Sequence, residues 1–229
     1  MGKMRKLSPE LLASREEIIR AFYEDTLILT SVEYTLDEDY DSLLSKLTEV
    51  LLTTRLSEII EIVKRTFILM PITKANIPQF SNFDDCYTGV PQGIMESGWE
   101  WAIYKKIGFL LRRSPRKDGA DQKYGENHSK IAMMMGIVKI EKPRGVCLTD
   151  FGKYTLSLSP DQRENLKAKL CFRIPIIHNY FCSDKDENTI TQCRAILSDT
   201  TYKRRLSNIK KLISIVNDRI NEELYGTTY

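Results

Sequence analysis

Apolar residues recur at helical spacing near the C-terminus of this chain, after a short polar break. Successive members of the series are three or four residues apart: Tyr202, Leu206, Ile209, Ile213, Val216 and Ile220. Such spacing predicts the buried face of a long helix. Before the break at Ser198-Asp199-Thr200, a shorter helical pattern begins at Asn188 or Thr189. A short helix, a tight turn and a long second helix together have the outline of a helix-turn-helix unit.

A helix, a glycine and an apolar strand are predicted in the same order twice in the middle of the chain. In the first copy, residues 98–111, the helix would end at Gly108 and a strand would follow. The second copy covers residues 130–138. It is followed by Pro143-Arg144-Gly145, which predicts a turn, and by a further apolar strand at 146–148. Helix, strand, basic turn and strand are the outline of a winged helix, so the pattern predicts two tandem units.

The N-terminal third is also predicted to be helical. Ser8-Pro9 fits a helix N-cap followed by proline in the first turn, and apolar residues then recur at helical spacing up to Phe22. Further helical patterns follow the acidic segment 37–41, and prolines and glycines between Pro71 and Gly98 indicate a long connection. We therefore expect helices to dominate this region.

Together these patterns predict a mainly α protein with tandem winged-helix or helix-turn-helix units, small β-wings and an N-terminal helical region. Four regions are expected: an acidic helical region at 1–70, a connection with a first winged-helix-like unit at 71–116, a winged helix at 117–158, and a C-terminal helix-turn-helix with a long basic helix at 159–229. Ser159-Pro160 opens the first helix of the last region.

Composition adds three expectations. The chain has 229 residues, of which 42% are hydrophobic and 28% charged, as in ordinary globular proteins. Its longest apolar run, 67–72, is far shorter than the ~20 residues that cross a bilayer, and no signal-peptide pattern is present, so we expect a cytoplasmic protein with no membrane partner. Five cysteines without a CxxC pair indicate reduced thiols, and we expect no metal and no cofactor.

Charge is segregated along the chain although its net value is only +3. Residues 8–61 contain thirteen acidic against four basic side chains. In residues 99–144 the balance is eleven basic against five acidic, and in residues 194–221 it is seven against two. Two basic regions in the C-terminal half suit a polyanion such as DNA. Two solvated helix faces account for the same charges equally well.

The last helix is predicted to present its polar face to DNA. Opposite the apolar series lie short polar and basic side chains that suit phosphates or base edges: Thr200, Thr201, Lys203, Arg204, Ser207, Asn208 and Lys211. The two threonines lie at the positive end of the helix dipole, which favours a phosphate. The alternative interpretation is a basic outer face in contact with solvent only.

Two further groups of candidates lie in the predicted winged helix. The polar side of its last helix carries Gln122, Lys123, Ser129 and Lys130, and the turn between the strands carries Lys142 and Arg144. Either group could contact a duplex or solvent only. His128 falls on the apolar side of the helix and is expected in the core rather than in a catalytic site.

Several of these segments resemble a known group of modules. Four segments carry the resemblance, in this order along the chain: residues 130–137, the sequence Leu148-Thr149-Asp150-Phe151-Gly152, the helix from Ser159, and the sequence Thr200-Thr201-Tyr202-Lys203-Arg204-Arg205. They resemble the winged-helix modules that accompany type II restriction endonucleases and related restriction-modification proteins. The resemblance covers about residues 117–221 and implies recognition of a DNA target. Asn127 and His128 replace the paired tyrosines of those modules, Met135 a leucine and Tyr202 an isoleucine, which affects base preference more than fold.

The favoured interpretation is therefore a sequence-specific binder of double-stranded DNA in a restriction-modification or defence system. Magnesium-dependent nucleases of the common kind carry an Asp followed by Glu-x-Lys on adjacent strands, and no such set is predicted here, so a non-catalytic chain is favoured. A dimeric transcriptional regulator and a protein-interaction scaffold remain as alternatives. Whether the chain forms a homodimer or joins a nuclease or methyltransferase partner is left open.

Overall fold

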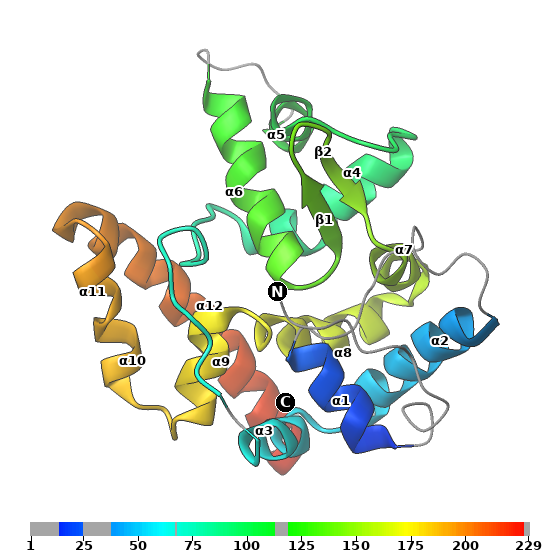
Figure 1. Cartoon of the computed structure of the whole chain (residues 1–229), viewed down its shortest axis with the longest axis vertical. Coiled ribbons are helices and arrows are strands. Elements are labelled where there is room, and N and C mark those ends of the chain that lie inside the picture. The colour runs from blue at the N-terminus through cyan, green and yellow to red at the C-terminus, as the bar shows by residue number, and fades with distance from the viewer. Residues whose placement is uncertain (1–13, 25–37, 67, 113–118, 227–229) are drawn as a thin grey trace.

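A computed structural model describes residues 14–24, 38–66, 68–112 and 119–226 (Figure 1). The described chain is mainly helical, with one small antiparallel sheet. The N-terminal helices are α1 (Arg15–Tyr23), α2 (Glu38–Thr53) and α3 (Leu56–Lys64). The middle of the chain forms the π-helix η2 (Asp85–Gly89), α4 (Val90–Glu96), α5 (Tyr104–Arg112), α6 (Ala120–Met134), β1 (Val138–Glu141) and β2 (Gly145–Leu148). The C-terminal helices are α7 (Asp150–Ser157), α8 (Pro160–Cys171), α9 (Pro175–Cys182), α10 (Glu187–Thr191), α11 (Cys193–Ile196) and α12 (Asp199–Tyr225).

These elements form two groups in space. Helices α4, α5 and α6 surround the β-hairpin in the upper half of Figure 1, while α1–α3 lie below with α8, α9 and α12. The lower group joins the two ends of the chain through polar contacts. The Tyr23 hydroxyl donates to the Lys169 carbonyl at 3.0 Å, and the Glu223 carboxylate accepts from the Leu56 amide at 2.7 Å. That carboxylate occupies the N-terminus of α3, whose N-cap side chain makes no capping bond.

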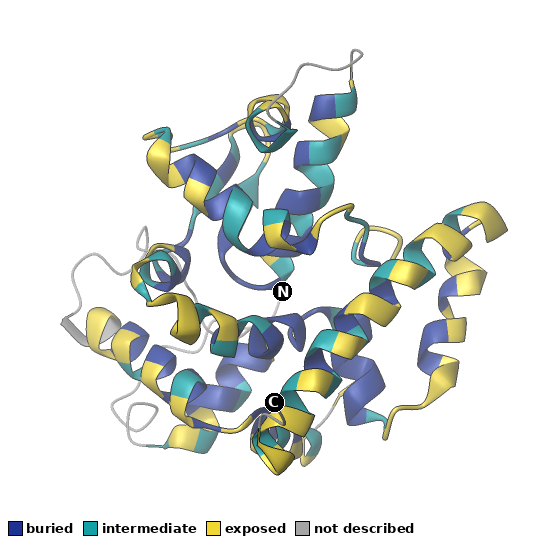
Figure 2. Ribbon diagram, turned by 180° about the vertical axis from the view of Figure 1, so that it is seen from behind, coloured by how far each residue is buried: buried dark blue, intermediate teal, exposed yellow. Residues whose placement is uncertain are grey.

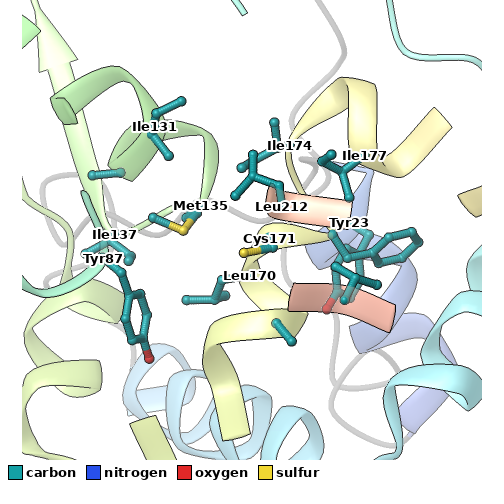
Figure 3. Packing of buried hydrophobic residues seen from close by; sticks show 14 of the residues in the cluster. Tyr23, Tyr87, Ile131, Met135, Ile137, Leu170, Cys171, Ile174, Ile177 and Leu212 are labelled. Atoms are coloured by element: carbon teal, nitrogen blue, oxygen red, sulfur yellow. The ribbon is translucent and has the colours of Figure 1, made fainter. Parts of the chain in front are cut away.

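The buried side chains of the two groups form one continuous cluster. Figure 3 shows the boundary, where Ile131, Met135 and Ile137 of the upper group approach Leu170 and Leu212 of the lower group. Burial of these apolar side chains holds the groups together. In Figure 2 the exposed positions of α12 follow its outer side, as the three- and four-residue spacing predicts.

Several expected elements are confirmed by the structure. The helix, strand, turn and strand expected from residue 130 correspond to α6, β1 and β2. Ser159 caps α8 in a capping box with Gln162. The short helices α10 and α11 come before α12, and a short break separates them from it. The described part of the N-terminal third is helical. The expected cap at Ser8 lies outside the described residues, and α1 begins at Arg15 after the N-cap Ser14.

The strand expected after Gly108 is wrong. Residues 109–111 continue α5, and Gly108 lies inside that helix rather than at its end. Its role is contact with α6, because a Cβ on Gly108 would lie 1.8 Å from the backbone oxygen of Asp121. Gly108 therefore allows two helices to approach closely and does not end a helix. The connection expected between Pro71 and Gly98 is also wrong in part, because η2 and α4 occupy residues 85–96. The four region boundaries stay a prediction.

Thr149 closes the hairpin onto α7. Its hydroxyl donates to the carbonyls of Gly136 and Ile137 at 2.8 and 2.9 Å and accepts from the amide of Gly152 at 2.9 Å. A Cβ on Gly152 would lie 2.0 Å from the Ile137 oxygen, so glycine is required there. The Leu-Thr-x-x-Gly sequence thus has a structural explanation. Thr149 caps α7, and Gly152 lets the backbone at Ile137, just before β1, pack directly against α7.

We expect Thr149→Val to lower the free energy of unfolding by about 2 kcal/mol, because a buried amide and two buried carbonyls lose their hydroxyl partner. Thr149→Ser keeps the hydroxyl and should lose clearly less. Urea denaturation of the three proteins measures both values. A valine variant as stable as the parent would show that the hydroxyl contributes little.

Candidate nucleic-acid interface

Helix α6 is held against α5 by direct contact between the two backbones. Gly125 of α6 lies over the first turn of α5, where a Cβ would be 2.0 Å from the Tyr104 oxygen. Gly108 of α5 makes the reciprocal approach to Asp121. Because both crossing positions lack side chains, the depth and direction of α6 are determined by backbone contact.

An aromatic stack holds the same helix from a second side. The Arg112 guanidinium lies 4.3 Å from the centroid of the Tyr124 ring, and the His128 ring stacks on Tyr124 with 3.9 Å between centroids. The Tyr124 hydroxyl donates to the Asp85 carboxylate at 2.5 Å. Burial lowers the pKa of His128, and its Nδ1 lies 2.8 Å from the Tyr124 carbonyl. His128 is 1% exposed, which confirms its expected place in the core.

The outward side of α6 carries most of the candidates expected there. Gln122 and Lys123 are exposed, and Lys130 is half-buried. The Lys130 and Lys123 ammonium groups lie 2.5 and 3.0 Å from the Glu126 carboxylate, and these hydrogen bonds, that of Lys130 first, hold the pKa of Glu126 below its usual value. Ser129 is a correction: it is 0% exposed and cannot touch a ligand from outside.

The β-hairpin runs alongside α6, and its turn lies toward the N-terminal end of that helix (Figure 1). Its strands pair from Val138 with Leu148 to Glu141 with Gly145. Ala102 pairs with Val146 of β2 as an isolated antiparallel bridge, with N–O distances of 2.7 and 2.9 Å. This single residue extends the edge of the hairpin. Lys142 and Arg144 are exposed at the turn, and the Arg144 guanidinium lies 4.8 Å from the Trp101 ring centroid. The turn thus presents two cations, and a cation–π contact with Trp101 stabilises the position of Arg144.

The N-terminal half of α12 presents five of its seven candidates to solvent. The exposed candidates are Thr200, Lys203, Arg204, Ser207 and Lys211. The other two are half-buried. The Thr201 hydroxyl accepts from that of Ser198 at 3.0 Å, and the Asn208 amide donates to the Phe80 carbonyl at 2.7 Å. Asn208 therefore has a structural bond that a base contact would have to replace.

Arg205 turns inward, unlike its neighbours. Its guanidinium donates to the carbonyls of Lys74 and Ile77 at 2.8 and 2.9 Å and to the side-chain oxygen of Gln79 at 3.0 Å. It thereby fastens the connection before η2 along α12. Helical spacing places Arg205 beside the buried Tyr202 and Ile209, unlike Lys203 and Arg204. Its acceptors lie more than 120 residues away, so the local sequence does not identify them.

The same connection lines a narrow polar cleft together with α6 and α12. The lining residues come from the connection, α6 and α12: Lys74, Ala75, Ile77, Gln79, Lys123, Asn127, Lys130, Ile131, Met134 and Arg205. The structure thus joins two candidates from α6, Lys123 and Lys130, with cations that the sequence did not single out. Gln122 instead lines a separate hollow beside the hairpin turn, which also includes Lys142.

Two absences concern the residues that the structure describes. Within them, no group of three or more His, Cys, Asp or Glu side chains is placed to hold a metal ion. No helix in the same part of the chain combines the length and apolar character needed to cross a membrane. Comparison of the chain with protein-family models, with curated proteins and with solved structures finds no match.

Proposed function

We propose that this chain binds double-stranded DNA through a winged helix formed by the described residues 90–112 and 119–148. The order of elements supports this proposal: α4, the paired position at Ala102, α5, α6 and the β1–β2 hairpin. In that arrangement α6 enters the major groove and the hairpin turn reaches the neighbouring backbone or minor groove. The observation that carries the proposal is the polar outward side of α6, held rigidly between a basic hairpin and the basic half of α12.

Charge distribution supports the same orientation. Five basic and no acidic side chains occur between residues 200 and 217, in the half of α12 on the same side of Figure 1 as α6. Helix α2, which has four acidic side chains against one basic, lies at the opposite side, so a duplex on the basic side would be kept away from it. Opposite charge on two sides orients a polyanion before contact is made.

Different residues would supply affinity and specificity. On α6, the amide of Gln122 suits base edges, whereas Lys142 and Arg144 at the turn suit phosphates. Arg204 is exposed and makes no ion pair with any described residue, so it is available for a guanine edge or a phosphate. Membership of a restriction-modification system is proposed on the resemblance of residues 117–221 alone.

The test is selection of duplexes from a random pool by the purified full chain, followed by anisotropy titrations of one selected and one scrambled duplex. We expect enrichment of a short sequence and affinity for it at least ~1,000-fold above that for the scrambled duplex. Affinity should fall steeply between ~50 and ~200 mM salt. Arg204→Ala and Lys142→Ala should each weaken binding and reduce the slope of log affinity against log salt by about one.

Lys153→Ala is the matched control. It removes one exposed positive charge from α7, where Lys153 pairs with Asp150, outside the proposed surface. The control should bind as the parent does, apart from a small long-range effect. Failure to enrich any sequence, or equal loss in all three variants, would contradict specific binding through this surface.

A further inference from the structure

The cleft between α6 and α12 gathers positive charge from three separate elements. Lys74 comes from the connection, Lys123 and Lys130 from α6, and Arg205 from α12. Of the described residues that line the cleft, none is acidic. Glu126 pairs with both α6 lysines from outside the lining, so one carboxylate faces two of the four cations. The cleft therefore retains a net positive charge after its ion pairs are made.

Arg205 holds the least compensated of these charges. All three of its hydrogen bonds end on neutral oxygens, two of backbone carbonyls and one of the Gln79 amide. Its buried Nε–H has no hydrogen-bond partner among the described residues. Burial and the nearby Arg204 lower the pKa of Arg205. A partly desolvated guanidinium with an unused donor is stabilised by an anion placed beside it.

The neutral polar groups of the cleft suit the same anion. Gln79 and Asn127 add side-chain amides, which donate hydrogen bonds to an oxyanion. The donors approach from the connection, from α6 and from α12, and so from several directions. A phosphodiester carries two charged non-bridging oxygens that diverge at the tetrahedral angle and can accept from different elements, whereas a planar carboxylate presents both oxygens along one edge.

We propose that this cleft is a phosphate-binding site in which α6, the connection and α12 hold one phosphate group. Resting on the proposed function, the source is a backbone phosphate of the bound duplex. A single phosphate contacted by both helices places α6 and the basic half of α12 on the same duplex. Arg205 then serves two purposes, since it fastens the connection and adds charge to the site.

The test variant is Asn127→Asp, which changes shape little and introduces a negative charge into the cleft. Lys123 and Lys130 lie one turn to either side on α6, so the variant should fold and keep its melting temperature. We expect affinity for the duplex to fall about tenfold and the slope of log affinity against log salt to decrease by about one.

The matched control is Gln162→Glu. It makes the same change of charge at the exposed third position of α8, where glutamate serves the capping box as well as glutamine. In a second measurement, melting temperatures of all three proteins are compared in ~10 mM inorganic phosphate and in chloride of equal ionic strength. Phosphate should raise the melting temperature of the parent and the control by a few degrees and that of Asn127→Asp by less.

The two measurements separate the possible results. A duplex that binds Asn127→Asp and Gln162→Glu equally well overturns the phosphate site and leaves DNA binding in place. If no duplex binds the parent, the proposed function fails and the melting temperatures decide. A shift in the parent and the control that is lost in Asn127→Asp then supports a site for free phosphate or a phosphomonoester, whereas equal shifts in all three proteins overturn it.

Discussion

Gly125→Ala is expected to destabilise the protein by about 3 kcal/mol or more and to abolish duplex binding. The added Cβ would lie 2.0 Å from the backbone oxygen of Tyr104, which no side-chain rotation can relieve. Overpacking of a tight core usually costs about 1–3 kcal/mol, and a backbone clash lies at the upper end of that range. Relief requires α6 to move away from α5, which also moves its outward side relative to the hairpin.

The matched control is Gly93→Ala in α4, measured beside Gly125→Ala by urea denaturation and by duplex anisotropy. A Cβ on Gly93 would meet only the side-chain end of Leu110, which can adjust. Alanine also favours the helix by up to about 1 kcal/mol, so the control should stay near the parent in both measurements. A Gly125→Ala protein with parental stability would show that α5 and α6 are not in backbone contact.

Acidification from pH 7 to pH 5 is expected to lower the free energy of unfolding by about 2 kcal/mol through His178 alone. Burial first, and the charge of Arg173 second, lower the pKa of this residue from 6.5 to about 4. Between these values the unfolded chain binds a proton that the folded chain does not. Stability is therefore fully present above pH 6.5 and is lost as the pH falls toward 4.

The measurement is urea denaturation at both pH values for the parent and for His178→Phe. Phenylalanine can keep the stacked packing on the Phe172 ring, whose centroid lies 5.0 Å away, and it cannot titrate. We expect the variant to lose about 2 kcal/mol less than the parent on acidification. His128 also has a lowered pKa, but it titrates in both proteins and cancels in the comparison. Equal losses in the two proteins would contradict a buried neutral His178.

Much of the candidate surface could be predicted because it depends on local spacing. The three- and four-residue spacing identified the buried side of α12, and five of its seven polar candidates are exposed. Ser129 failed because it lies at the margin of the buried side of α6. Periodicity locates the centre of a buried stripe, but the width of that stripe depends on which elements cover it. A serine is small and polar enough for either environment.

The amino-acid sequence by itself determined most of the helices, several of their caps and the hairpin, because each depends on residues a few positions apart. Ser159 with Gln162, and Thr149 with Gly152, are such local pairs. The tertiary structure alone decided that Gly108 lies at a helix crossing, which distant carbonyls Arg205 binds, and that Lys74 joins Lys123 and Lys130 around one cleft. These features depend on which distant segments meet. Local spacing carries no record of that choice, since packing between elements is determined by the whole chain at once.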